Sequence, residues 1–197
     1  MKLASYDAVV VGSGFGGTLA AHALTRAGRR VLLLERGRWA HRDDLDWNQR
    51  EILLNQRYRG QTPILVQQYG ARRFSEVFAN ETVGGKSVFY GGASLRLRAA
   101  DFRNWPFSYD DLKKYYARAE ELLGVHGTAG ADPYEPPDVA GYPFAPVELS
   151  APARRIETAG HALGYSPFPI PLAINFRSEE RPRCLLCNTC DGYPCKI

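Results

Sequence analysis

Residues 7–17 read DAVVVGSGFGG, an apolar run that leads directly into a cluster of glycines. The run is rich in β-branched residues, which is typical of a strand buried on both faces. The glycines match the pattern GxGxxG at Gly12, Gly14 and Gly17. Residues 18–27 are good helix formers, and Gly28 follows them where a helix C-terminus favours glycine. The stretch therefore predicts a strand, a tight turn and a helix.

A second buried strand is expected at residues 31–34, and Glu35 follows it eighteen residues after Gly17. Strand, glycines, helix, strand and acid in this order indicate a dinucleotide-binding site. The glycines let backbone approach a pyrophosphate, the helix N-terminus offers N–H groups to the phosphates, and the acid accepts hydrogen bonds from ribose. Glu35 disfavours the 2′-phosphate of NADP, although Arg36 could serve one. The alternative is a glycine-rich turn used only for packing.

Two further segments point to a particular family. Residues 80–95, NETVGGKSVFYGGASL, hold a second group of glycines. Residues 105–125, WPFSYDDLKKYYARAEELLGV, form an amphipathic helix in which Ser108 and Asp111 approximate a capping box. Together with the first glycine motif, these segments resemble the glucose–methanol–choline (GMC) family of flavoenzymes, and in particular its cholesterol-oxidase-like branch.

The resemblance implies an α/β fold, a Rossmann-like FAD-binding domain that is incomplete here and is followed by the start of a substrate or cap domain. It implies FAD as the cofactor, with the second glycine loop against the flavin pyrophosphate and isoalloxazine. Tyr90 stands where the family often has asparagine. The expected cofactor-binding residues are Gly12, Gly14, Phe15, Gly17, Glu35, Gly84, Gly85, Ser87, Tyr90, Gly91 and Gly92.

The same resemblance implies an FAD-dependent oxidoreductase that oxidises a CH–OH group of a small-molecule alcohol by hydride transfer to flavin, with oxygen or another electron acceptor reoxidising it. The family's catalytic histidine and its partner lie near the far C-terminus, and no residue here matches them. The catalytic residues are therefore unknown, and we expect the chain to be the N-terminal portion of a longer enzyme. Alternatives are a truncated, inactive flavin- or metal-binding remnant and an NAD-dependent dehydrogenase.

Charge, apolar runs and cysteine placement bear on the possible partners and the cellular location of the protein. The 197 residues carry a net charge of +4 without a run of like charges, so no nucleic-acid partner is expected. No apolar run reaches the length of a membrane span, and cysteines are absent before residue 184, so a cytoplasmic protein is the expectation. The predicted domains are residues 1–126 for FAD binding, a proline- and glycine-rich linker at 127–147, and the start of a substrate domain at 148–197.

The four cysteines are confined to the end of the chain. Their spacing is C-x2-C-x2-C-x4-C, at Cys184, Cys187, Cys190 and Cys195. Three interpretations remain open, namely packing or disulfide formation, an iron–sulfur or other metal centre, and redox chemistry. No metal ligand is assigned on this basis.

The remaining elements follow from local pattern. Residues 41–58 predict a helix, residues 64–69 and 73–79 have strand character, and Ser150 is expected to cap a helix that runs to Leu163. Because the later strands of a doubly wound sheet are missing, the first two strands should leave apolar surface exposed.

Overall fold

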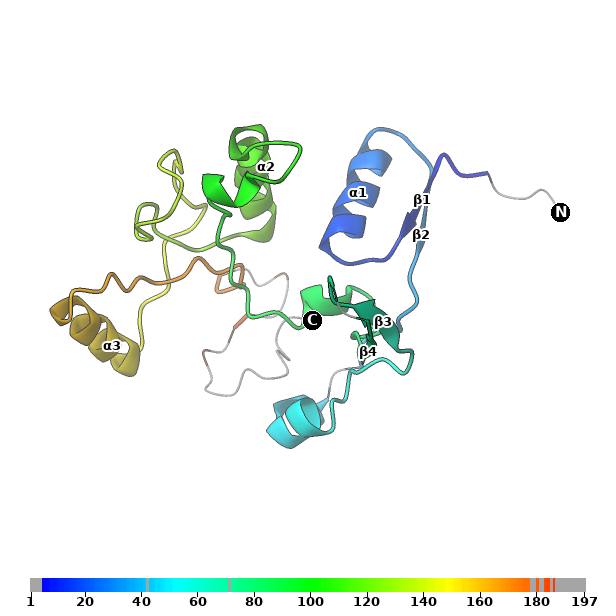
Figure 1. Cartoon of the computed structure of the whole chain (residues 1–197), viewed down its shortest axis with the longest axis horizontal. Coiled ribbons are helices and arrows are strands. Elements are labelled where there is room, and N and C mark those ends of the chain that lie inside the picture. The colour runs from blue at the N-terminus through cyan, green and yellow to red at the C-terminus, as the bar shows by residue number, and fades with distance from the viewer. Residues whose placement is uncertain are drawn as a thin grey trace. The chain divides into compact units, whose positions relative to one another are not determined.

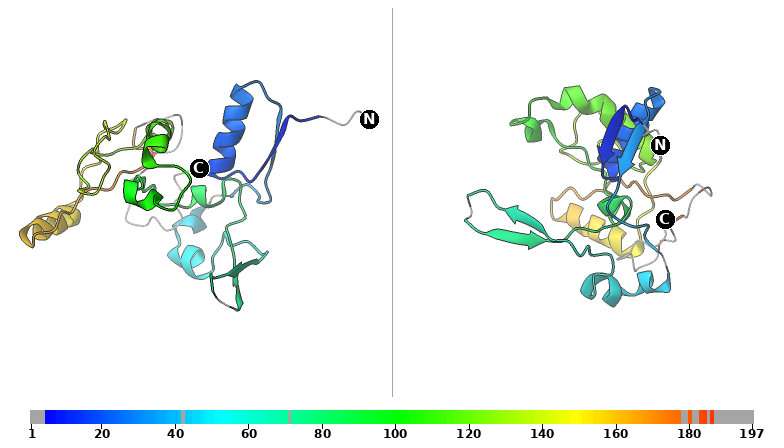
Figure 2. Two further views of the ribbon diagram at one scale, coloured as in Figure 1. Left: turned by 45° about the horizontal axis from the view of Figure 1, so that its top comes forward. Right: turned by 90° about the vertical axis from the view of Figure 1, so that its right-hand side faces the viewer.

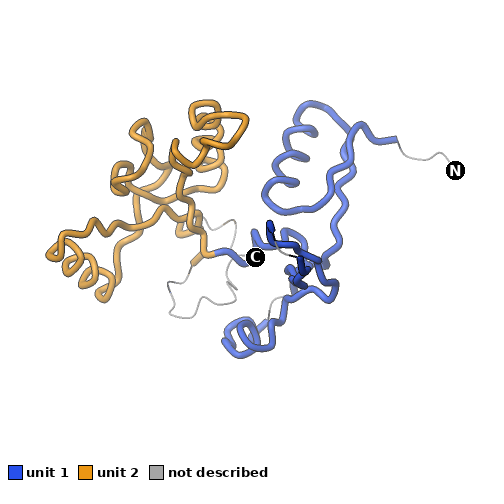
Figure 3. The backbone as a smooth tube through the Cα atoms, in the orientation of Figure 1, with its two compact units in different colours: residues 1–90, 186–195, 197 blue, residues 91–185, 196 orange. Residues whose placement is uncertain are grey.

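The computed structural model describes residues 5–41, 43–70, 72–177, 180, 183–184 and 186. The chain divides into two compact units, with the main boundary between Tyr90 and Gly91 (Figure 3). The first unit holds the residues up to Tyr90 together with Leu186, and the second begins at Gly91. The domain boundaries expected from the sequence stay a prediction.

The first unit begins with the strand, helix and strand predicted from the sequence. Strand β1 (Ala8–Val11) pairs in parallel with β2 (Val31–Leu34), and helix α1 (Phe15–Arg26) connects them (Figure 1). The register places Ala8 opposite Val31 and Val11 opposite Leu34. A parallel pair joined by a crossover helix is the unit from which Rossmann-like sheets are built, so the predicted fold class is confirmed.

The expectation that both strands are buried on two faces is wrong for the described chain. Burial alternates along β1, and the side chains of Val9 and Val11 are 57% and 82% exposed. Alternate residues of a strand point to opposite faces, and α1 packs against this pair of strands. One face of the pair is therefore left uncovered by the described residues, and the predicted exposure of apolar surface is confirmed.

Residues 41–58 do not form the single helix that their pattern predicts. They contain a 3-10 turn, η1 (Asp44–Trp47), and a π-helical turn, η2 (Arg50–Leu54). The side chain of Asp43 accepts a hydrogen bond from Leu45 N, and that of Asn48 accepts one from Arg50 N. Short polar side chains that bind nearby backbone compete with a continuous helix in this way.

The other two strands that were predicted in the first unit form a hairpin. Strand β3 (Ile64–Gln67) pairs with β4 (Phe74–Val77) in antiparallel register, and Ile64 lies opposite Val77. Figure 2 shows this pair as a two-stranded ribbon. Both strands are shorter than the predicted residues 64–69 and 73–79. The turn around Gly70, which has a positive φ of 79°, occupies the residues between Gln67 and Phe74. At its other end β4 stops at Val77, and Ala79 O accepts a hydrogen bond from Gly60 N instead.

The described part of the second unit contains the helices α2 (Tyr109–Leu123) and α3 (Ala151–Ala162), with the 3-10 turn η4 (Ala99–Phe102) preceding α2. Their predicted caps are present: the hydroxyls of Ser108 and Ser150 accept hydrogen bonds from the backbone of Asp111 and Ala153. Across the described parts of both units, every helix is too short or too polar to cross a bilayer.

A buried ion pair fixes the start of the second unit to α2. Arg96 Nε and Nη2 each donate to the Glu120 carboxylate at 2.7 Å, and the two side chains are only 4% and 6% exposed. Arg96 Nη1 also donates to the Tyr109 hydroxyl at 2.9 Å. The hydrogen bonds that Arg96 donates to Glu120 and Tyr109 raise the pKa of Arg96 above its ordinary value, so the guanidinium stays charged.

Candidate cofactor-binding site

The first glycine loop turns directly from β1 into α1. Gly12 N donates to Leu34 O at 2.7 Å, which keeps the start of the loop beside the end of β2. A Cβ placed on Gly17 would lie 1.9 Å from Gly12 O and 3.3 Å from Val10 Cγ1. Only glycine permits this close approach of helix to strand, as the motif requires.

The N-terminus of α1 is open to an anion. Gly14 is the N-cap and provides no side-chain cap, and the first turn carries no acidic residue. A Cβ placed on Gly16 would meet nothing within 4 Å. The first N–H groups of a helix have no partner within it, and the helix dipole favours negative charge there. These residues therefore fit the pyrophosphate of a dinucleotide.

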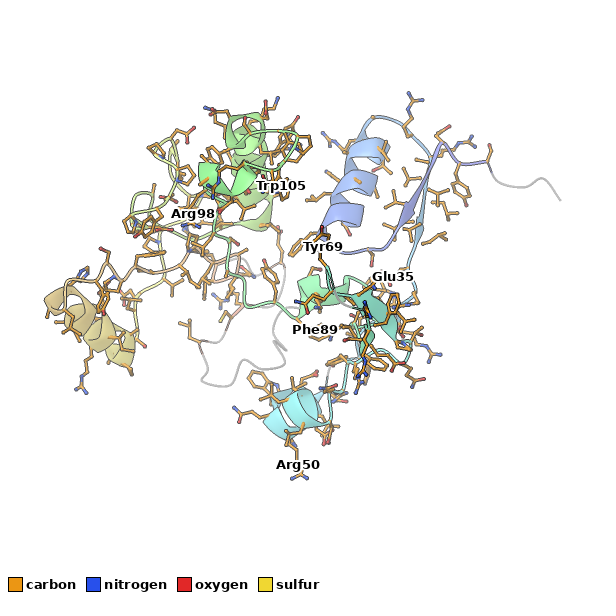
Figure 4. The ribbon with its side chains drawn as sticks, viewed as in Figure 1. Glu35, Arg50, Tyr69, Phe89, Arg98 and Trp105 are labelled. Atoms are coloured by element: carbon orange, nitrogen blue, oxygen red, sulfur yellow. The ribbon has the colours of Figure 1, made fainter. Side chains whose placement is uncertain are left out.

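Glu35 lies immediately after β2, where Figure 4 labels it, and three donors hold its carboxylate. Oε2 accepts hydrogen bonds from Ser13 N at 2.9 Å and Ser13 Oγ at 2.6 Å, and Oε1 accepts one from Gly37 N at 2.7 Å. The Ser13 hydroxyl, followed by the Gly37 and Ser13 N–H groups, lowers the pKa of Glu35 to about 2. The carboxylate is therefore ionised and fixed in orientation at neutral pH.

The second glycine loop meets the first within the same unit. It forms the 3-10 turn η3 (Gly85–Val88), whose N-cap Gly84 has a positive φ of 86°. Gly84 N donates to Ser13 Oγ at 2.8 Å, and Ser87 Oγ donates to Gly84 O at 2.7 Å. The ring of Tyr90 meets that of Phe15 edge to face, with 5.1 Å between centroids. The structure thus brings together the predicted residues from Gly12 to Tyr90.

Two predicted site residues, Gly91 and Gly92, open the second unit. Gly92 O accepts a hydrogen bond from Ala173 N at 2.7 Å, and a Cβ on Gly92 would lie 2.6 Å from Ile174 Cγ1. The positive φ of 80° at Gly92 and its contact with the Ile174 side chain therefore account for glycine at position 92 within the second unit itself. A role of these two glycines at the cofactor stays a prediction.

Sequence reasoning missed Ser13. Its side chain is buried, with the residue only 8% exposed, and it contacts both Glu35 and Gly84. The available signal was a hydroxyl between two motif glycines that lies close to the acid at the end of the next strand. In a parallel pair, both positions fall at the same edge of the sheet, so a polar contact between them could have been expected.

Arg36 forms an ion pair with Glu81. Its Nη2 lies 3.0 Å from Glu81 Oε1, in a pair whose side chains are 53% and 20% exposed. This pairing and the ionised Glu35 both speak against a 2′-phosphate, in agreement with the expected preference against NADP.

The structure describes only one of the four cysteines of the cluster, Cys184. Cys187, Cys190 and Cys195 lie outside the described residues. Cys184 is half-buried, and its backbone N donates to Asn175 O at 2.8 Å. The role of the cysteine cluster stays a prediction.

Comparisons with known proteins agree with this geometry. Residues 10–40 match the family model of an NAD(P)-binding Rossmann-like domain. The chain is 33% identical to paromamine 6′-oxidase of Streptomyces fradiae, over 96% of this chain and 35% of that protein. It is 30% identical to 2-methyl-1,2-propanediol dehydrogenase of Mycolicibacterium austroafricanum, over 88% of this chain and 34% of that protein. The crystal structure of pyridoxine 4-oxidase from Mesorbium loti superimposes with a TM-score of 0.55 at 24% identity, covering 87% of this chain and 37% of that one, and shows a shared fold.

The proteins that match are GMC-type flavin oxidoreductases, and FAD is their cofactor. The family resemblance and the FAD cofactor predicted from the sequence are therefore confirmed. The chain spans about a third of the length of these curated relatives, 35% and 34% for the two named above.

Proposed function

We propose that this chain, a relative of the GMC-type flavin oxidoreductases, is the FAD-binding portion of an enzyme that oxidises a CH–OH group of a small-molecule alcohol. The observation that carries the proposal is the meeting of the two glycine loops at Ser13, beside the ionised carboxylate of Glu35. When bound, FAD supplies the acceptor for the hydride that leaves the alcohol carbon.

The described residues have separate roles in holding FAD. The N–H groups in the first turn of α1 bind the pyrophosphate, because they have no side-chain cap and lie at the positive end of the helix dipole. Glu35 accepts hydrogen bonds from ribose, because it is ionised and held in position. Gly84, Gly85 and Ser87 belong to the second loop, which lies against the flavin pyrophosphate and isoalloxazine in this proposal. No described residue is assigned as the catalytic base.

The substrate class, the electron acceptor and the cellular location are also proposals. The two relatives named above are an oxidase of paromamine and a dehydrogenase of a diol, which supports a small alcohol as substrate. We keep an electron acceptor other than oxygen among the proposed partners, because a dehydrogenase stands beside an oxidase among these relatives. The cytoplasm remains the proposed location on the sequence grounds given above.

A second candidate is an NAD-dependent dehydrogenase, which the match of residues 10–40 to an NAD(P)-binding model favours. The second glycine loop argues against it, because a nicotinamide dinucleotide site needs only the first loop, the helix and the acid. The two functions differ in which dinucleotide the protein retains.

Titration of the purified chain with FAD and, separately, with NAD⁺ tests the proposal. FAD should bind with quenching of its fluorescence and with resolved visible absorption bands, whereas NAD⁺ should not compete. Replacing Gly16 by leucine fills the open space at the helix N-terminus and should abolish binding. The matched variant Ala23→Leu, at an exposed position further along α1, should bind FAD normally. Retention of NAD⁺ in place of FAD would overturn the assignment.

A further inference from the structure

Ser13 is the point at which three distant segments of the first unit meet. Its hydroxyl contacts Glu35, which is 22 residues away, and Gly84, which is 71 residues away. Its backbone N also donates to Glu35 Oε2, and its backbone O accepts a hydrogen bond from Thr18 Oγ1 at 2.8 Å. Both backbone groups of Ser13 are therefore hydrogen-bonded, which fixes the position of its hydroxyl.

The directions of the two hydroxyl bonds follow from the partners. An ionised carboxylate only accepts hydrogen bonds and a backbone N–H only donates them, whereas a hydroxyl does both. The Ser13 O–H therefore donates to Glu35 and uses a lone pair to accept from Gly84 N. Alanine or glycine at position 13 would leave the Gly84 N–H and one acceptor site of Glu35 without this partner.

The same hydroxyl holds the two glycine loops together. A Cβ placed on Gly14 would lie 3.7 Å from Gly84 O, so the two backbones are already near contact distance. The edge-to-face meeting of Phe15 and Tyr90 also joins these loops, but it is not a polar link. Ser13 thus supplies a directional bond between the loops at the position where their backbones approach.

We propose that Ser13 is a positioning residue for FAD: it orients the Glu35 carboxylate toward ribose and holds the second glycine loop against the first. The inference rests on the proposed function, because it assumes that both loops bind the same cofactor. It assigns a role to a motif position that the GxGxxG pattern leaves open.

The test compares FAD affinity in four forms of the chain: Ser13→Ala, Ser13→Cys, Ser13→Thr and the unchanged protein. Loss of the hydroxyl leaves two partners unpaired, so Ser13→Ala should weaken FAD binding by about tenfold or more. Ser13→Cys keeps the size but offers only a weak donor and should also weaken binding. Ser13→Thr keeps the hydroxyl and should restore both the affinity and the visible circular dichroism of the bound flavin.

Two further measurements separate positioning from general damage to the fold. Thr25→Ala is the matched control, because the Thr25 hydroxyl bonds to carbonyls of its own helix, and it should bind FAD like the unchanged chain. Amide exchange without FAD should quicken in residues 84–90 of Ser13→Ala while that of β1 stays slow. Equal FAD affinity in Ser13→Ala and the unchanged chain would overturn the inference alone. Failure of the unchanged chain to bind FAD would overturn the proposed function and the inference with it.

Discussion

Substitution of Gly17 by alanine should separate α1 from β1 and destabilise the first unit, because the added Cβ would collide with the first glycine loop. The added Cβ would lie 1.9 Å from Gly12 O and 3.0 Å from Gly12 C. Since close carbon–oxygen contacts are about 3.3 Å, the helix and the loop would have to separate by about 1.4 Å. Both neighbouring atoms belong to the backbone, so no side chain can rotate to relieve the contact. Overpacking of this kind costs about 1–3 kcal/mol.

Gly16 provides the matched control, because it is the preceding residue of the same helix and its Cβ would meet nothing within 4 Å. Alanine there should be neutral or stabilising by up to about 1 kcal/mol, since alanine favours helix over glycine. Amide exchange of residues 8–26 reports local opening in both variants. Gly17→Ala should exchange about thirtyfold faster at a cost of about 2 kcal/mol. Equally slow exchange in the two variants would refute the close approach of α1 to the first loop.

Other predictions concern charge. The low pKa of Glu35 predicts that the ionised carboxylate stabilises the fold above its ordinary pKa of 4.5, and that this stabilisation is lost as the pH falls towards about 2. Glu35→Gln should therefore remove this pH dependence from acid unfolding. An acid transition that is unchanged in Glu35→Gln would contradict the prediction. Glu120→Gln should destabilise the second unit by about 3–5 kcal/mol, because it leaves the charge of the buried Arg96 without a compensating negative charge. The exposed pair Arg98–Asp101 is the control, and Arg98→Ala should change thermal unfolding little. Equal effects of the two substitutions would show that the Arg96 pair is not buried.

The elements that the sequence predicted well are those determined by local chemistry. The first strand, helix and strand follow from apolar runs and glycines, and α2 and α3 follow from serine caps and amphipathic spacing. Residues 41–58 misled the prediction because Asp43 and Asn48 bind backbone that a helix would need. Competition between short polar side chains and helix bonds depends on rotamers, which spacing alone does not report.

Strand burial and the contact of Ser13 with Gly84 could not be predicted for a different reason. An apolar strand has the same sequence whether or not another element covers it, so the exposure of Val9 and Val11 depends on partners from elsewhere. The Ser13 bond to Gly84 joins residues 71 positions apart. Periodicity identifies faces within one element, whereas such a contact depends on how separate loops meet.

The placement of Ser13 also resolves an electrostatic conflict within the site. A pyrophosphate at the N-terminus of α1 and the Glu35 carboxylate are both negative, and each needs N–H or O–H donors. Glu35 takes its donors from the N–H and O–H of Ser13 and from the N–H of Gly37. These groups precede α1 or follow β2, so the first N–H groups of the helix remain available to the phosphates. The serine between the first two glycines thus lets one short loop satisfy an acid and an anion with separate sets of donors.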